Sequence, residues 1–245
     1  MPTPNNLAPI FSQLPSQQLL AVAKDIQLRL LQDNRNYDVT PADYAVQRII
    51  LDYFAQSDLA GTYRISSEEI VDLSQQVDSD QATWELIIDP LDGTHAFCRQ
   101  EDTWGVMVGA RDLAGKLIYS WNLVSTGDIY SSTTAARRPL SHRTKLERVD
   151  VYDYGVNQTQ FFSEQTSYPA AVWAGWQLYQ EQLDGLIWLP STAGKKIYPD
   201  YDLIFLGALE AQGWQVYRKR ERGNVVQIAV ARTEENIMKL LNIRV

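Results

Sequence analysis

The sequence predicts a layered fold that mixes α-helices and β-strands. Apolar residues recur with helical spacing over residues 17–31, and a second helical pattern runs to residue 54 after Thr40-Pro41-Ala42-Asp43, which is typical of a capped helix start. Strand-like segments then follow one another as a block. Because helices and strands come in blocks rather than in strict alternation, the order favours stacked layers over a TIM barrel.

The strands of the first half are expected to form a meander covered by the two helices. They occupy residues 83–88, 104–110, 116–124 and 128–131. The second half is expected to hold strands at residues 149–154, 186–189, 214–217 and 225–231, and helices at residues 170–182, 201–212 and 234–241. No linker-like tract divides the chain, so we expect one compact domain over residues 1–245, with approximate halves 1–140 and 141–245.

Composition excludes several classes of function. The formal net charge of -8 disfavours nucleic-acid partners and anionic membrane surfaces. Cys98 is the single cysteine and the sequence has two histidines, so an intramolecular disulfide and a zinc cage of thiolates and imidazoles are both excluded. Any metal must be held by oxygen. The sequence shows no signal-peptide pattern and no membrane-spanning run, so we expect a cytoplasmic protein.

The sharpest motif is Asp89-Pro90-Leu91-Asp92-Gly93-Thr94, which follows an apolar strand pattern. Pro90 and Gly93 favour a tight turn in which the two carboxylates converge, and Mg²⁺ prefers such oxygen ligands. If a helix begins at Gly93, its free N–H groups suit a phosphate oxygen. The alternative interpretation is that both acids are only turn and cap residues.

This hexapeptide resembles the signature of the inositol monophosphatase family, a magnesium-dependent, lithium-sensitive phosphatase superfamily. Asp38 to Asp43 is similar to the family's Val-Thr-x-x-Asp, and Ser66-Ser67-Glu68-Glu69 is similar to its Gly-Glu-Glu. Residues 201–214 resemble its Trp-Asp-x-x-Ala helix, so the resemblance covers roughly residues 17–231. It implies a layered αβαβα sandwich of the inositol monophosphatase and fructose bisphosphatase type.

The resemblance also implies a phosphoric monoester hydrolase with two or three Mg²⁺ ions. Members of the family often form dimers, so a homodimer is implied as well. The substrate is expected to be a small phosphorylated metabolite. The metal ligands would be Glu68, Asp89, the Leu91 carbonyl, Asp92 and Asp202. The catalytic residues would be Asp43, Thr94 and Glu68. The residues that bind substrate would be Gly93, Thr94, His95, Lys195 and Lys196.

Each of these residues also has a structural interpretation. Asp43 fits the acid of a capping box, and Asp202 fits the cap of the following helix. Glu68 fits a first-turn acid that complements a helix dipole. His95 fits a surface histidine, and Lys195-Lys196 fit solvated loop charges. Capping explains each acid singly, but it does not explain why all of them occur in the order of one family.

The sequence departs from the family pattern at Ser67, at His95-Ala96 and at Tyr201, and none of these changes removes a proposed ligand. The segment 141–169 is short and lacks the usual glycine-rich stretch, which leaves the substrate open. Two alternatives remain. One is a nucleotide bisphosphate phosphatase, suggested by Lys195 and Lys196, and the other is a non-catalytic relative that keeps the fold for binding.

Overall fold

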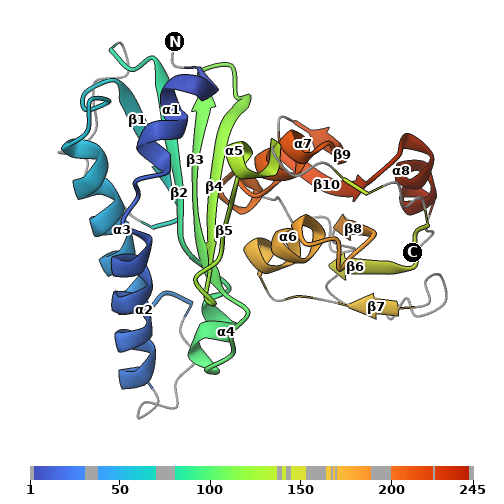
Figure 1. Ribbon diagram of the computed structural model, residues 1–245, viewed down its shortest axis with the longest axis horizontal. Coiled ribbons are helices and arrows are strands. Elements are labelled where there is room, and N and C mark those ends of the chain that lie inside the picture. Colours follow the sequence, from blue (N-terminus) through green and yellow to red (C-terminus); the bar gives the residue numbers. More distant parts are fainter. Residues whose placement is uncertain are drawn as a thin grey trace.

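Two five-stranded sheets form the frame of the described part of the chain (Figure 1). The computed structural model describes residues 3–30, 38–69, 81–136, 140–141, 145–152, 164–166, 168, 170–188, 200–222 and 224–242. The first sheet holds β1 (Tyr63–Ser67), β2 (Trp84–Asp92), β3 (Gly105–Asp112), β4 (Leu117–Val124) and β5 (Ile129–Ser131) in that order. The strands β2 to β5 are antiparallel neighbours, so the predicted meander is confirmed, and β1 adds a parallel edge.

The second sheet has the order β7-β6-β8-β10-β9. Its strands are β6 (Arg148–Tyr152), β7 (Glu164–Thr166), β8 (Gly185–Trp188), β9 (Gln215–Glu221) and β10 (Asn224–Ala231). The strand β6 is parallel to β7 and β8, whereas β10 is antiparallel to β8 and β9. Helices fill the remaining layers: α1 (Pro4–Phe11), α2 (Ser16–Leu30), α3 (Pro41–Ala55), α4 (Thr94–Cys98), α5 (Ser132–Ala136), α6 (Ala171–Tyr179), α7 (Leu206–Gln212) and α8 (Glu234–Leu241).

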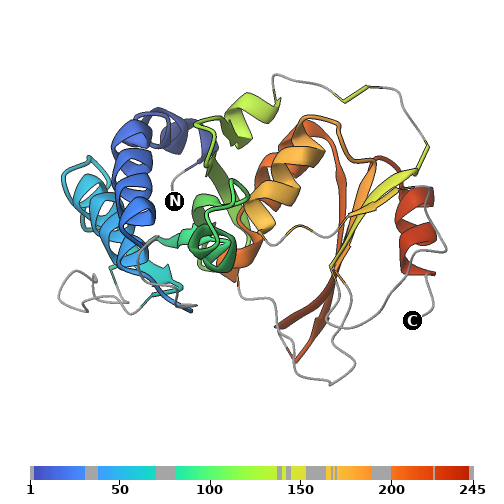
Figure 2. The same cartoon turned by 90° about the horizontal axis from the view of Figure 1, so that it is seen from below.

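Figure 2 shows the layers edge-on: α2 and α3, the first sheet, the central helices α6 and α7, the second sheet, and α8. Three apolar clusters lie between these layers. One packs α1 to α3 on the first sheet, the second joins both sheets through α6 and α7, and the third packs α8 on the second sheet. In β2, Ile87 belongs to the central cluster while Leu86 and Ile88 belong to the outer one, as the two-residue period of a strand requires. The predicted αβαβα sandwich is therefore confirmed.

The expected helix over residues 201–212 is wrong in one respect. A 3-10 turn, η2 (Asp200–Leu203), comes first, and α7 begins at Leu206. Leu203, Ile204, Phe205 and Leu206 are all buried, and four consecutive buried positions do not fit one face of a regular helix. The sequence does not predict the short elements α1, α4, α5, β1 and β7, although it allows a helix to begin at Gly93.

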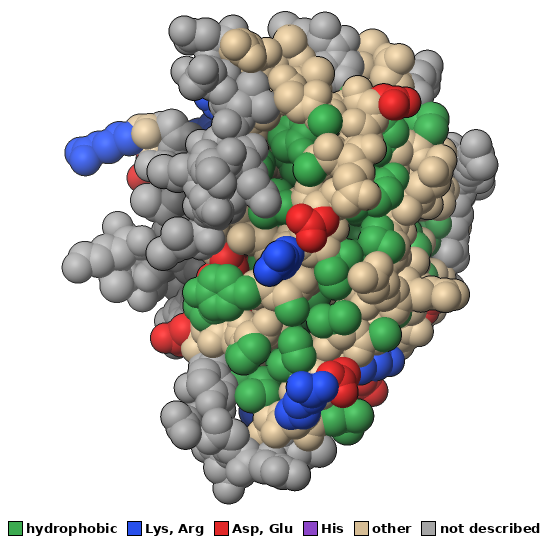
Figure 3. Space-filling view, turned by 90° about the vertical axis from the view of Figure 1, so that its left-hand side faces the viewer, with side chains coloured by type: hydrophobic (Ala, Val, Ile, Leu, Met, Phe, Trp, Pro, Cys, Tyr) green, Lys and Arg blue, Asp and Glu red, His purple; other side chains and the backbone are tan. Residues whose placement is uncertain are grey.

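The outer face that carries α2 and α3 shows apolar side chains among polar ones, with few charges between them (Figure 3). Leu28 and Tyr44 are the large apolar side chains most exposed on these two helices. No described helix has both the length and the apolar composition that are needed to cross a membrane.

Candidate functional site

The motif Asp-Pro-Leu-Asp lies at the end of β2, which runs on to Asp92 instead of ending at Asp89. In a regular strand, residues three apart face opposite sides of the sheet. Here the register of β2 against β3 shifts between Asp89 and Asp92, and the irregularity accommodates Pro90, which has no N–H for the ladder. The Asp89 side chain is 1% exposed, and its Oδ1 accepts the Leu91 N–H at 3.2 Å. This irregularity allows the carboxylates of Asp89 and Asp92 to face the same side of the sheet.

Gly93 turns the chain from β2 into the short helix α4. Its φ of 88° lies in the left-handed region, which favours glycine, and it occupies the N-cap position of α4. The helix therefore begins at Thr94, one residue after Gly93. The Thr94 hydroxyl donates to the Leu91 carbonyl oxygen at 3.0 Å. Leu91, Gly93 and Thr94 thus lie together directly beside the two acids.

Asp43 lies in the first turn of α3 and is fully buried. Its Oδ2 accepts both the Thr40 N–H at 2.6 Å and the Thr40 hydroxyl at 2.7 Å, so the capping box expected as the structural interpretation is present. The other carboxylate oxygen, Oδ1, is buried and has no hydrogen-bond partner among the described residues. Burial raises the pKa of Asp43, against the lowering effect of the Thr40 bonds. Capping accounts for one oxygen of this side chain and leaves the second available.

Glu68 reaches this region from the end of β1. Its N–H donates to the Ile88 carbonyl oxygen at 3.1 Å, and the parallel pairing of β1 with β2 places it beside Asp89. Glu68 is exposed as a residue, yet partial burial raises its pKa to about 7, with a further contribution from the charge of Asp202. Burial and the charges of Asp43 and Glu68 also raise the pKa of Glu69 to about 7.

Asp89 and Asp92 are the most strongly perturbed acids of the cluster. Burial, followed by the charges of Asp92, Glu68 and Asp202, raises the pKa of Asp89 well above its ordinary value. A side-chain hydrogen bond between Asp89 and Glu68 raises the pKa of Asp89 further and lowers that of Glu68. The pKa of Asp92 is likewise raised well above its ordinary value, first by burial.

Two elements from the second half of the chain complete the cluster. The Val172 N–H, in the first turn of α6, donates to Asp92 Oδ2 at 2.5 Å. The turn η2 packs against β2 and β3 and carries Asp202, whose charge acts on Glu68, Asp89 and Asp92. The contact with Val172 was not predicted, because a backbone N–H 80 residues away leaves no sequence signal.

The remaining predicted residues differ in position. His95 has a side chain that is 60% exposed, and its Nε2 lies 3.9 Å from Asp38 Oδ1, so it faces solvent. Lys195 and Lys196 lie outside the described residues. Tyr201 lies next to Asp202, and burial followed by the charge of Asp202 raises its pKa to about 12.

The chemistry of this cluster suits a hard cation. Every side-chain ligand that it offers is an oxygen, and the charge of a cation would offset the burial and the repulsion that raise the pKa values of Asp89 and Asp92. Within the described residues, no three Asp, Glu, His or Cys side chains stand close enough to enclose one metal ion. Mg²⁺ is usually bound by one or two carboxylates, with water and phosphate oxygens completing the shell, so a closed cage of protein ligands is not required.

Comparison with known proteins decides the family. The model of the inositol monophosphatase family matches residues 9–132, just over half of the 245 residues. The chain belongs to the inositol monophosphatase family. The matched region contains Asp43, Glu68, Asp89 and Asp92, while Asp202 lies beyond it.

Several solved structures share the fold at low sequence identity. The extragenic suppressor protein suhB from Bartonella henselae is 14% identical with a TM-score of 0.73, covering 98% of this chain and 99% of that one. Inositol monophosphatase from Anabaena (Nostoc) sp. PCC 7120 is 17% identical with a TM-score of 0.69, covering 97% and 96%. A Ca-bound family protein from Staphylococcus aureus is 13% identical with a TM-score of 0.70, covering 100% and 97%. A search of curated proteins finds no match to this chain.

Proposed function

We propose that this protein is a magnesium-dependent phosphatase that hydrolyses a small phosphate monoester. The observation that carries the proposal is that the carboxylates of Glu68, Asp89, Asp92 and Asp202 act on one another through their charges, beside the turn from β2 into α4, in a chain of the inositol monophosphatase family. A structural role does not account for the set, because four mutually repelling carboxylates destabilise a fold unless protons or a cation offset their charge.

The carboxylates of Glu68, Asp89, Asp92 and Asp202 and the Leu91 carbonyl oxygen would hold the ions. The Ca-bound Staphylococcus aureus relative supports a site for divalent cations in this fold. When bound, Mg²⁺ supplies charge that stabilises the attacking and leaving oxygens and lowers the pKa of a bound water.

The protein's own groups would position the phosphate and the water. The Gly93 and Thr94 N–H groups lie at the start of α4, where phosphate oxygens are favourably bound. Asp43 would accept the proton of the attacking water through Oδ1, the oxygen left without a partner, and its raised pKa makes it a stronger base than an ordinary aspartate. The Thr94 hydroxyl would orient that water.

The proposal is tested by measuring phosphate release from inositol, sugar and nucleotide phosphates, with Mg²⁺ and with EDTA. We expect hydrolysis of at least one monoester with Mg²⁺ and none in EDTA. Asp92→Asn should lower kcat by orders of magnitude. The control Asp102→Asn, which removes an exposed acid outside the cluster, should leave kcat unchanged. Full activity in EDTA, or equal effects of the two variants, would exclude this site, and inactivity on the whole panel with a folded protein favours the non-catalytic alternative.

A further inference from the structure

A row of charged side chains crosses three strands of the first sheet. Arg64 lies opposite Glu85 in the parallel pairing of β1 with β2, and Glu85 lies opposite Arg111 in the antiparallel pairing of β2 with β3. Arg64 Nε donates to Glu85 Oε1 at 3.1 Å, and Arg111 Nε donates to Glu85 Oε2 at 2.6 Å. Glu85 alternates with Ile87 of the central cluster, so the row lies on the face that meets the second half of the chain. The buried Glu85 carboxylate therefore fixes the direction of the Arg111 guanidinium group.

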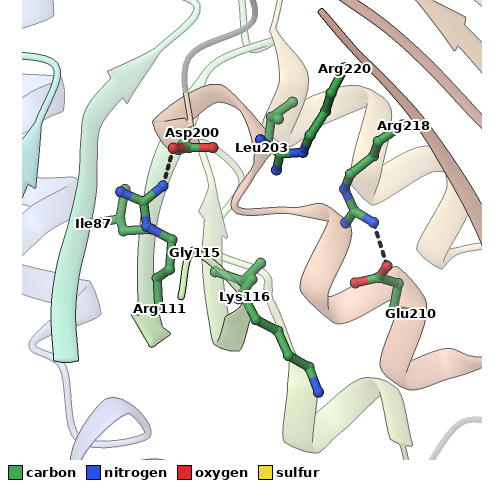
Figure 4. Close-up of a pocket in the computed structure, with 10 residues that line it drawn as sticks. Ile87, Arg111, Gly115, Lys116, Asp200, Leu203, Glu210, Arg218 and Arg220 are labelled. Carbon is green, nitrogen blue, oxygen red and sulfur yellow. Dashed lines mark hydrogen bonds and ion pairs between the residues drawn. The ribbon is translucent and has the colours of Figure 1, made fainter. Parts of the chain in front are cut away.

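Arg111 extends this row from the sheet to the turn η2. Its Nη1 donates to the Oδ2 atom of Asp200, the first residue of η2. Figure 4 shows this pair at the wall of a cavity of about 230 Å³, which Lys116, Arg218 and Arg220 also line. The Arg111 side chain is 15% exposed and the Asp200 side chain 39% exposed, so water and salt screen this pair less than a fully exposed one.

The same part of β3 packs against the other end of η2. Gly109 lies two positions before Arg111, on the same face of the strand, and a Cβ there would lie 3.2 Å from Ile204 Cγ2. Leu203, the last residue of η2, is buried in the central cluster. Apolar packing therefore holds η2 on the sheet at one end, and the Arg111 ion pair holds it at the other.

The turn η2 also carries Asp202 of the acidic cluster. A 3-10 helix has about three residues per turn, so side chains two positions apart project in directions roughly 240° apart. Asp200 thus contacts Arg111, whereas the charge of Asp202 acts on the other acids, Glu68 and Asp89 among them. A rotation or shift of this short turn would move Asp200 and Asp202 together.

We propose that Arg111 is a positioning residue for the acidic cluster. Through Asp200 it fixes η2 on the first sheet and thereby places the Asp202 carboxylate where it helps to hold a divalent cation. The inference rests on the proposed phosphatase function, and Arg111 would act through η2 rather than by contact with the cation. Removing a partly buried, charge-assisted hydrogen bond lowers the population of the competent arrangement, so the Mg²⁺ Kd should weaken by about three- to tenfold.

The test is a calorimetric titration of the metal-free full chain with Mg²⁺. Asp200→Asn and Arg111→Gln should each weaken the Kd by about three- to tenfold, and the double variant should be no weaker than the weaker single variant, because the pair acts as a unit. A simple charge effect has opposite signs: losing the negative charge of Asp200 weakens cation binding, whereas losing the positive charge of Arg111 strengthens it. Tighter binding in Arg111→Gln, or changes below about twofold in both variants, would overturn the proposal.

Hydrogen exchange in EDTA gives a second measurement that does not depend on bound metal. It is needed if Arg111→Gln, which takes a counter-charge from the buried Glu85, does not fold. Asp200 is partly exposed, so Asp200→Asn should fold, and its amides over residues 200–206 should exchange about three- to tenfold faster than in the parent. A weaker Kd in Asp200→Asn without faster exchange there would be a charge effect and would overturn the proposal.

The ion pair of Arg218 with Glu210 is the matched control. It joins β9 to α7 at 2.6 Å in the same cavity (Figure 4), and its side chains are 24% and 41% exposed, close to the values for Arg111 and Asp200. Neither residue lies on η2, so Arg218→Gln and Glu210→Gln should each change the Mg²⁺ Kd by less than about twofold.

Equal losses of Mg²⁺ affinity on breaking either pair would overturn the proposal, because they would mark a general loss of stability. Failure of the phosphatase proposal would appear separately, as a parent chain that does not bind Mg²⁺. The exchange rates over residues 200–206 in Asp200→Asn would then still decide whether the pair fixes the turn.

Discussion

Gly93→Ala should destabilise the protein far more than the same change at a glycine of similar backbone conformation. A Cβ at Gly93 would lie 2.7 Å from the Ala170 Cβ, 2.9 Å from the Thr103 carbonyl oxygen and 3.3 Å from the Trp104 Cα. Two of these atoms belong to backbone and cannot rotate away. Gly61 is the matched control, because its φ is 76° and a Cβ there meets nothing within 4 Å.

The expected free-energy losses follow from these two environments. An L-residue in the left-handed region costs about 1–2 kcal/mol, which applies to both positions. Forcing a methyl group into a packed site costs about 1–3 kcal/mol more, which applies to Gly93 alone. Gly93→Ala should therefore lower the free energy of unfolding by roughly 2–5 kcal/mol, and Gly61→Ala by roughly 1–2 kcal/mol.

The assay is equilibrium unfolding in urea for both variants, with the m-value compared to the parent. Phosphate release should also fall in Gly93→Ala, because Ala170 precedes the turn of α6 whose Val172 N–H holds Asp92. Gly61→Ala should keep its kcat. If both variants lose the same stability, the close approach at Gly93 does not constrain the chain, and our account of the turn into α4 is wrong.

Three further predictions concern the acids. Asp92→Asn should raise the free energy of unfolding in EDTA, since it removes one charge from a repelling cluster, and should abolish stabilisation by Mg²⁺ in a thermal-shift titration. Thr94→Ala and Asp43→Asn should depress kcat while leaving the Mg²⁺ dependence near normal; if Asp43→Asn changes only stability by ~1 kcal/mol, capping is its whole role. In EDTA, unfolding free energy should fall as pH rises from about 5 to 8, because Glu68 and Glu69 have folded-state pKa values of about 7, above the ordinary 4.5, and their protonated forms favour the fold. A stability that rises over this pH range would contradict the last prediction.

The sequence predicted the elements whose signals are local. Helical spacing located α2, α3 and α8, and alternating or continuous apolar runs located β2 to β4 within a few residues. Pro90 and Gly93 marked the turn at the acids, because proline and glycine restrict the backbone in ways that depend little on tertiary context. For the same reason, the capping box of Thr40 and Asp43 could be expected from four residues.

What could not be predicted depends on contacts between distant segments. The five-residue strand β1 has weak alternation and is defined by its pairing with β2. The break between η2 and α7 follows from the burial of four consecutive apolar residues in the central cluster, a demand of packing rather than of propensity. The cavity joins Arg111 and Lys116 to Arg218 and Arg220, about a hundred residues further along the chain, and no local pattern indicates that proximity.

The acids of the site lie where the two halves of the chain meet, and this placement has an energetic consequence. Glu68 and Asp89 come from the first sheet, while Asp202 belongs to a turn in the second half. Their repulsion therefore opposes the packing of one half on the other, and the apolar cluster between the sheets must offset it. A cation bound between acids from both halves would reverse the sign of this contribution. Binding would then stabilise the packing of the layers on one another. The hydrogen bond from the Val172 N–H to Asp92 would extend this stabilisation to α6.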